Sequence, residues 1–188
     1  MLKRLMEFGK YVEITGFRNV SVGDAKIFAD ALSKSLPAGV EAQLFNADLI
    51  ATWEHLYFAA INALSAFKTR RNVSKSLAVE TALYASAQRQ IKKAIDSVGL
   101  KPGSKNAALL LVGGDADSVV KALSTVSQQL CRLPDDSVLE LTEPKVSRIR
   151  REFAVSDAEL KAVFSSQHPS QALADLVVER VALLSTRL

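Results

Sequence analysis

The chain has 188 residues, which is about the length of one domain, and its 48% hydrophobic and 23% charged residues are typical of a globular protein. Disorder and collagen-like structure are therefore excluded, and the longest uncharged stretch, residues 56–67, is too short to cross a bilayer. A single cysteine, Cys131, excludes a disulfide framework, and two histidines leave little for a metal site. With no secretory signal visible at the N-terminus, we expect a cytoplasmic protein without a cofactor, and the net charge of +4 hints at a polyanionic partner.

The first part of the chain alternates between strand and helix patterns. Apolar and polar residues alternate at 11–18 and 40–45, as they do in half-buried strands. Apolar residues at steps of three and four predict a helix after each of these strands. The first helix is capped by Asp24 and ends before Pro37, and the second covers residues 52–68.

The middle of the chain predicts two more helices and up to two strands. A long helix is expected over residues 74–98, opened by Ser74, because its apolar stripe continues until a glycine ends it. The apolar run 107–112 is typical of a central strand. A helix over 115–132 follows, and residues 137–141 are a possible last strand.

Three helix-start signals follow, and the last helix is expected to end near Leu184. They are Pro144, a capping box formed by Ser156 and Glu159, and Pro169. No repeat or linker divides the chain. We therefore expect one α+β domain over residues 1–188, with roughly three to four strands in a small mixed sheet and six to seven helices.

The signals for nucleotide binding and catalysis are weak. Gly113-Gly114 joins a strand to a helix, where free N–H groups can hold a phosphate, but two aspartates at the helix start would repel one and no Walker lysine is present. We interpret this junction as a structural turn, and a small nucleotide-binding enzyme is the alternative. Because neither histidine lies in a nucleophile motif, we expect His55 to be hydrogen-bonded or partly exposed and His168 to be structural or solvated.

A basic segment is the clearest sign of a binding function. Between residues 68 and 93 the chain has seven cations and one acid, Glu80. On one continuous helix Lys75, Arg89 and Lys93 would point away from the apolar stripe, as expected of a surface that follows phosphates. A solvated helix face is the alternative. Glu80 falls on the buried side of that helix, where it needs an ion pair or a hydrogen bond.

The order and spacing of several short motifs resemble one family over residues 12–184. The motifs are Leu44-Phe45-Asn46-Ala47-Asp48-Leu49-Ile50, Glu54-His55-Leu56 with Ala59, Arg71-Asn72-Val73-Ser74-Lys75, Glu80 with Leu83-Tyr84, Arg89-Gln90-Ile91 with Ala94-Ile95, and Glu179-Arg180-Val181-Ala182-Leu183-Leu184. The chain resembles the PRPK-binding-protein (TPRKB-like, CGI) subunit of the KEOPS complex, in its archaeal form. Three features depart from the family: Arg70 stands where relatives often carry glycine, Ala87-Gln88 replaces a glycine-containing step often seen before Arg-Gln-Ile, and residues 185–188 extend past the Leu-Leu ending.

The resemblance implies a non-catalytic subunit of the machinery that makes threonylcarbamoyladenosine in tRNA. Such a subunit binds the small atypical kinase (Bud/PRPK) and captures tRNA through its single-stranded 3′ CCA end. The residues expected to bind tRNA are Lys68, Arg70, Arg71, Asn72, Lys75, Arg89, Gln90 and Lys93. For the kinase we expect an apolar patch on the C-terminal helix, with core packing as the alternative; its residues are Leu176, Val177, Leu183 and Leu184. A scaffold that binds the kinase but not RNA is the main alternative function, and no membrane partner is expected.

Overall fold

The computed structural model describes residues 1–163 and 169–186, and His168 therefore lies outside the described residues. Four strands form one sheet in the order β1-β2-β4-β3, and every neighbouring pair is antiparallel. The strands are β1 (Leu2–Leu5), β2 (Lys10–Phe17), β3 (Glu41–Asn46) and β4 (Ala107–Gly113). The two central strands, β2 and β4, pair over seven residues, from Tyr11 opposite Gly113 to Phe17 opposite Ala107.

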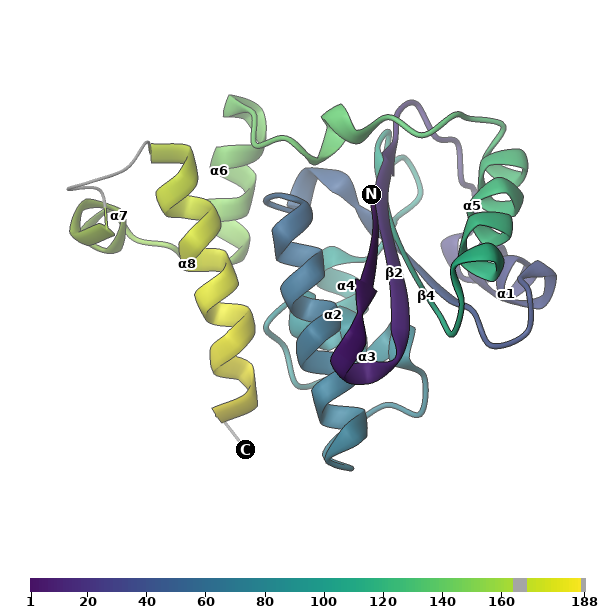
Figure 1. Cartoon of the computed structure of the whole chain (residues 1–188). Coiled ribbons are helices and arrows are strands. Elements are labelled where there is room, and N and C mark those ends of the chain that lie inside the picture. The colour runs from purple at the N-terminus through teal and green to yellow at the C-terminus, as the bar shows by residue number, and fades with distance from the viewer. Residues whose placement is uncertain (164–168, 187–188) are drawn as a thin grey trace.

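Eight α-helices surround the sheet in the described part of the chain, together with short 3₁₀ turns. The helices are α1 (Ala25–Ser35), α2 (Trp53–Lys68), α3 (Leu77–Ala85), α4 (Ile91–Val98), α5 (Ala116–Leu130), α6 (Glu143–Glu152), α7 (Asp157–Val163) and α8 (Pro169–Leu183). Figure 1 shows α1 and α5 on one side of the sheet, and α2 and α8 on the other. The molecule is therefore built in layers, with the sheet between two groups of helices.

Strand β4 explains why both faces of the sheet are covered. All seven of its residues are buried. Leu109 and Leu111 belong to the core beneath α1 and α5, whereas Leu110 and Val112 belong to the larger core on the opposite face. Because side chains alternate between the two faces of a strand, an apolar residue at every position requires helices on both sides.

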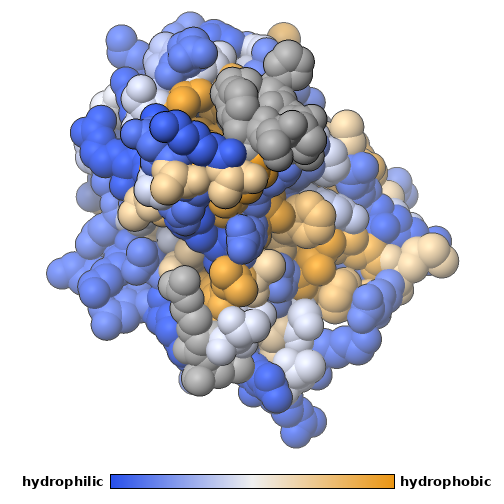
Figure 2. All heavy atoms as spheres, turned by 90° about the vertical axis from the view of Figure 1, so that its left-hand side faces the viewer, coloured by the Kyte–Doolittle hydropathy of each residue, from blue (hydrophilic) through white to orange (hydrophobic). Residues whose placement is uncertain are grey.

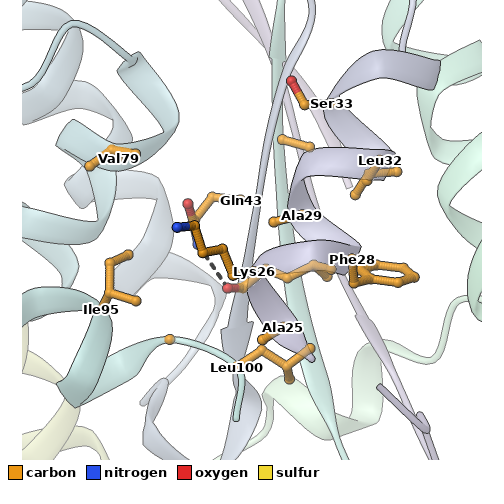
Figure 3. Close-up of a pocket in the computed structure, with 13 residues that line it drawn as sticks. Ala25, Lys26, Phe28, Ala29, Leu32, Ser33, Gln43, Val79, Ile95 and Leu100 are labelled. Carbon is orange, nitrogen blue, oxygen red and sulfur yellow. Dashed lines mark hydrogen bonds between the residues drawn. The ribbon is translucent and has the colours of Figure 1, made fainter. Parts of the chain in front are cut away.

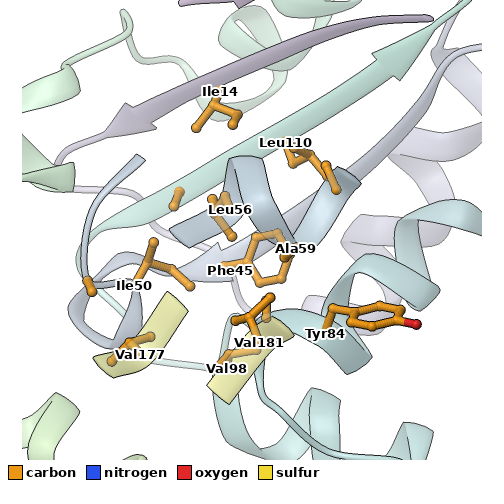
Figure 4. Packing of buried hydrophobic residues seen from close by; sticks show 14 of the residues in the cluster. Ile14, Phe45, Ile50, Leu56, Ala59, Tyr84, Val98, Leu110, Val177 and Val181 are labelled. Carbon is orange, nitrogen blue, oxygen red and sulfur yellow. The ribbon is translucent and has the colours of Figure 1, made fainter. Parts of the chain in front are cut away.

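The larger core joins the sheet to α2 and α8. Phe45 and Leu110 from the sheet pack in one cluster with Leu56 of α2 and with Val177 and Val181 of α8 (Figure 4). Helix α2 also packs against α3. This arrangement fixes the position of the turn that connects α2 to α3, which carries the basic segment.

Most of the predicted elements are confirmed. The three strands expected from apolar patterning correspond to β2, β3 and β4, and the α+β class is confirmed. Asp24 caps α1 as expected, since its carboxylate accepts from the N–H groups of Lys26 at 2.8 Å and Ile27 at 3.0 Å. The capping box also forms, with Glu159 accepting from the Ser156 N–H at 2.8 Å. The sheet is antiparallel throughout, where we expected a mixed one.

The expected long helix over 74–98 is wrong. It is two helices, α3 and α4, separated by a turn at residues 86–90. Ala87 adopts a left-handed conformation with φ of 52°, and its N–H donates to the Tyr84 carbonyl at 2.9 Å. The N-cap of α3 is Ser76 rather than Ser74. The apolar stripe hid the break, because its spacing continues across the turn into α4.

Two further differences lie at the edges of the sheet. Residues 137–141 do not form a strand; a 3₁₀ turn covers Asp136–Leu139 and buries Val138 and Leu139. This turn lies directly against Gly16, where an added Cβ would come within 2.0 Å of a Val138 methyl carbon. Strand β1 was not predicted, because only Leu5 of its four residues is buried and the pairing with β2 defines it.

His55 is fully buried and links the start of α2 to the end of α3. Its Nδ1 accepts from the Ala51 N–H at 3.2 Å, and its Nε2 donates to the Ala85 carbonyl at 2.7 Å. Its ring also meets the Phe153 ring edge to face, with centroids 5.4 Å apart. The expected hydrogen bonding is confirmed, whereas partial exposure is wrong. Burial lowers the pKa of His55 from 6.5 to about 4, so the imidazole is neutral at physiological pH.

We predict that the fold loses stability in mild acid through His55. In the unfolded chain the imidazole takes up a proton below its ordinary pKa of 6.5, whereas in the fold it remains neutral down to about 4. The free energy of unfolding should therefore fall as the pH drops from 6.5 towards 4, by about 2 kcal/mol between pH 7 and pH 5. Urea unfolding at these two pH values measures it. His55→Gln should be less stable at pH 7 and should lack this loss; an equal loss in both proteins contradicts the prediction.

Candidate nucleic-acid interface

The turn between α2 and α3, residues 69–76, is called the basic turn here and presents three exposed cations. Arg70, Arg71 and Lys75 are all exposed. Arg70 ends α2 in a left-handed conformation with φ of 57°, at a position where glycine is usually preferred. The next N–H, from Arg71, donates back to the Ala66 carbonyl at 2.9 Å. The backbone therefore reverses sharply after α2 and turns these side chains outward.

Glu80 lies beneath the basic turn. Its carboxylate accepts from the N–H groups of Val73 at 2.9 Å and Ser74 at 2.7 Å. The expectation of a buried, hydrogen-bonded Glu80 is confirmed, and its partners are backbone groups rather than a cation. Burial raises the pKa of Glu80, and the two N–H donors act in the opposite direction.

The second group of cations follows α3. Arg89, Lys92 and Lys93 are exposed in the turn at 86–90 and in the first turn of α4. The predicted common face with Lys75 on one helix is wrong, because the chain bends between α3 and α4. Arg89 instead lies near Tyr84: burial and Glu80 raise the pKa of the Tyr84 hydroxyl, and the Arg89 guanidinium opposes that rise.

A polar pocket of about 380 Å³ lies next to Arg71 and Tyr84. Its lining consists of side chains from the end of α2, the basic turn, α3 and the end of the chain: Asn62, Ser65, Ala66, Thr69, Arg71, Tyr84, Ser185 and Thr186. Asn62, Ser65 and Thr69 follow one another along one face of α2 at helical spacing. An aromatic ring, a guanidinium, an amide and several hydroxyls therefore surround one space. We call it the Arg71–Tyr84 pocket.

The charges around this pocket are largely uncompensated. Lys68 pairs with Glu7 at 3.2 Å. Among residues 1–163 and 169–186, the other cations of the predicted RNA site form no ion pair; they are Arg70, Arg71, Lys75, Arg89 and Lys93. The surface therefore has the positive field that attracts a polyanion.

The two uncharged residues of the predicted RNA site have different surroundings. The Asn72 side chain donates to the Ser74 carbonyl at 2.9 Å, so its amide nitrogen already holds the basic turn together. Gln90 is exposed and is the N-cap of α4, without a side-chain capping bond. The Gln90 amide is therefore available to a ligand, whereas the Asn72 side chain is partly engaged.

The residues expected to bind the kinase are mostly core residues. Leu176, Val177 and Leu184 are buried, and Leu183 is 39% exposed. Leu176 and Val177 lie in α8 and Leu184 directly follows it, and all three belong to the larger core, where α8 packs against α2. The core-packing alternative therefore describes these three residues, and of the four only Leu183 is exposed on the surface.

An aromatic surface on α2 was missed. The rings of Trp53, Tyr57 and Phe58 form a chain, with centroids 5.6 Å and 5.7 Å apart, and Phe58 is 40% exposed. Figure 2 views the side of the molecule where α8 lies and shows apolar side chains exposed there. The signal in the sequence was that α2 has more apolar residues than one buried face needs. We call these three rings the aromatic strip.

The Gly113-Gly114 junction is a structural turn. A Cβ on Gly113 would come within 2.7 Å of a Val119 methyl carbon, so glycine permits the close approach of β4 and α5. The Asp115 carboxylate accepts from the Ser118 N–H at 2.8 Å and occupies the start of α5. This bond and the Ser118 hydroxyl lower the pKa of Asp115. The site that a phosphate would need is therefore taken by a carboxylate.

The other surface features of the described residues offer few polar groups for catalysis. A groove of about 230 Å³ between α1, β3, α3 and α4 is mainly apolar (Figure 3), and the Gln43 side chain donates to the Leu44 carbonyl there. In the described ranges, no three His, Cys, Asp or Glu residues are grouped as a metal site would require. No helix of the described chain has the length and apolar character to cross a membrane.

Comparison with known proteins agrees with the expected family. Residues 17–185 match the family described as "Kinase binding protein CGI-121". The chain is also 33% identical to "Regulatory protein Cgi121" of Methanocaldococcus jannaschii over 117 residues, which are 62% of this chain and 72% of that protein. The resemblance seen in the sequence motifs is confirmed. The chain belongs to the CGI-121 family of kinase-binding proteins.

Proposed function

We propose that this chain is a non-catalytic subunit of the KEOPS tRNA-modification complex, which binds the small atypical kinase and recruits tRNA through its 3′ CCA end. Kinase binding is the established property of the family. The observation that carries the RNA part is the Arg71–Tyr84 pocket together with the exposed cations of the predicted RNA site, of which Lys68 alone pairs with a carboxylate of the described chain.

The chemistry of the pocket suits a single-stranded RNA end. Unpaired nucleotides are recognised by stacking on aromatic rings and by hydrogen bonds to sugar hydroxyls and base edges. Tyr84 is mostly buried and presents a small area, 8% of its surface, to the pocket. Asn62 and Thr69 supply acceptor oxygens, because the Asn62 amide already donates to the Phe58 carbonyl and the Thr69 hydroxyl to the Ser65 carbonyl. Arg71, Lys75 and Arg89 would attract the phosphates that lead into the pocket. A volume of about 380 Å³ lies within the ordinary range for a small-ligand site.

The aromatic strip and Leu183 support a separate kinase contact. Exposed aromatic side chains are enriched at protein interfaces, where they contribute much of the binding energy. Phe58 of α2 and Leu183 of α8 are large apolar side chains that are exposed. Kinase binding and RNA binding would then use neighbouring surfaces, since the face of α2 that begins at Phe58 continues through Asn62 and Ser65 into the pocket.

A kinase-binding scaffold without RNA binding is the second candidate. It is favoured by the aromatic strip, which suits a protein partner and needs no RNA. A small nucleotide-binding enzyme is disfavoured, because Asp115 occupies the helix start at the Gly113-Gly114 turn.

We predict that reversing two charges of the basic turn weakens tRNA binding. Arg71→Glu with Lys75→Glu should remove about two phosphate contacts and lower the slope of log Kd against log salt by about two. Gel shifts at several salt concentrations measure both quantities. The control is Lys34→Glu with Lys121→Glu, which makes the same change in net charge at exposed positions of α1 and α5. If both double variants bind tRNA equally, the RNA site is elsewhere.

We predict that the aromatic strip binds the kinase. Phe58→Glu, and separately Leu183→Glu, should weaken binding of the small atypical kinase by about tenfold or more, because each places a charge in an apolar contact. Calorimetric titration measures the affinity, with circular dichroism as the check on folding. Ile27→Glu is the matched control, since Ile27 is exposed on α1. If both variants bind the kinase as tightly as Ile27→Glu does, the kinase contact is not at the aromatic strip or Leu183.

A further inference from the structure

Glu80 is an unusual residue for its position in α3. Every residue of this helix except Val79 is buried, and the other side chains of the buried set are apolar or, for Thr81, bonded within the helix. Glu80 is only 2% exposed, and burying a carboxylate is costly unless its oxygens are hydrogen-bonded. Both of its partners, the N–H groups of Val73 and Ser74, belong to the basic turn. An apolar residue would serve the packing of α3 without this cost.

A second carboxylate holds the other end of the same turn. Glu41, at the start of β3, accepts from the Ser76 hydroxyl at 2.7 Å and from the Ala78 N–H at 3.0 Å. Between these two anchors the Ser76 N–H donates to the Ser74 hydroxyl at 3.1 Å. The turn is therefore tied to both α3 and β3.

The two anchors place negative charge close beneath exposed cations, yet neither carboxylate pairs with one. Among the described residues, Glu41 and Glu80 bond only to backbone N–H groups and one hydroxyl. The side chains of Arg71 and Lys75 therefore remain available to solvent while their backbone is held. A binding site whose backbone is fixed in advance loses less conformational entropy when a ligand orders it.

We propose that Glu80 and Glu41 are positioning residues of the RNA site, which hold the basic turn so that Arg71 stands at a fixed point beside Tyr84 and Lys75 at a fixed point on the same turn. This inference rests on the proposed RNA function. A free carboxylate near the site would repel phosphate. The oxygens of these two carboxylates instead accept hydrogen bonds from the turn and from the start of α3. The two carboxylates would affect RNA binding indirectly, by holding the backbone of the turn.

The test compares three substitutions in α3. Glu80→Leu removes the acceptor of the two turn N–H groups. Thr81→Val is the matched control, because it removes a buried side-chain hydrogen bond of 2.9 Å from the same helix without touching the turn. Glu80→Gln keeps an acceptor oxygen and loses the charge. The probe is a short single-stranded RNA ending in CCA, at fixed salt, with melting temperature and circular dichroism recorded for each protein.

We expect Glu80→Leu to raise the Kd for the probe by about tenfold, which is the loss of about one charge-assisted contact. Thr81→Val and Glu80→Gln should stay within about twofold of the unmodified chain. Amide hydrogen exchange at residues 73 and 74 should quicken in Glu80→Leu and not in Thr81→Val. If Glu80→Leu does not fold, Glu41→Leu with Glu41→Gln as its conservative partner gives the same comparison from the partly exposed anchor.

The outcomes separate this inference from the function on which it rests. If the unmodified chain does not bind the probe, the proposed RNA function and the positioning role both fall. If the unmodified chain binds and a folded Glu80→Leu binds as well as Thr81→Val does, the positioning role alone is wrong. A Glu80→Gln protein that loses as much affinity as Glu80→Leu also overturns it, because the retained acceptor should be sufficient.

Discussion

The burial of β4 on both faces is the constraint on which the rest of the fold depends. A strand with an apolar residue at each position leaves neither face of the sheet to water, so helices must cover both. On the larger side α2 lies against the sheet and packs against α3 and α8. The end of α2, the basic turn, the end of α3 and the residues that follow α8 consequently meet, and the Arg71–Tyr84 pocket forms where they do.

Two buried polar residues connect this packing to the surface. His55 bonds the entry of α2 to the last turn of α3, so the two helices keep a fixed relation. Glu80 bonds α3 to the basic turn. Buried polar side chains destabilise a core unless all their hydrogen bonds are made. In this protein the bonds of His55 and Glu80 each hold a backbone segment that apolar contacts alone would leave free to shift. The exposed cations of the basic turn therefore stand on a backbone that is hydrogen-bonded to the core.

The sequence could predict the regular elements but not the way in which they meet. Apolar periodicity identified β2, β3, β4, α1, α2 and α5, because each buries one clear face or is wholly apolar. The break after α3 was missed because Ala87, unlike glycine, gives no sign of a left-handed turn. The basic composition was visible in the sequence. The approach of Arg89 to Tyr84 depends on the bend between α3 and α4, however, and that of Arg71 depends on the packing of α2 against α3. Burial of the C-terminal leucines likewise depends on α2.

The proposed RNA function requires that the chain hold an unpaired RNA end beside Tyr84. The most direct measurement compares the affinity of the chain for intact tRNA and for the same tRNA with its three terminal nucleotides removed, at one salt concentration. The account predicts that removal weakens binding by about tenfold or more, since the pocket contacts are lost and only general attraction to phosphates remains. Equal affinities for the two RNAs would contradict it.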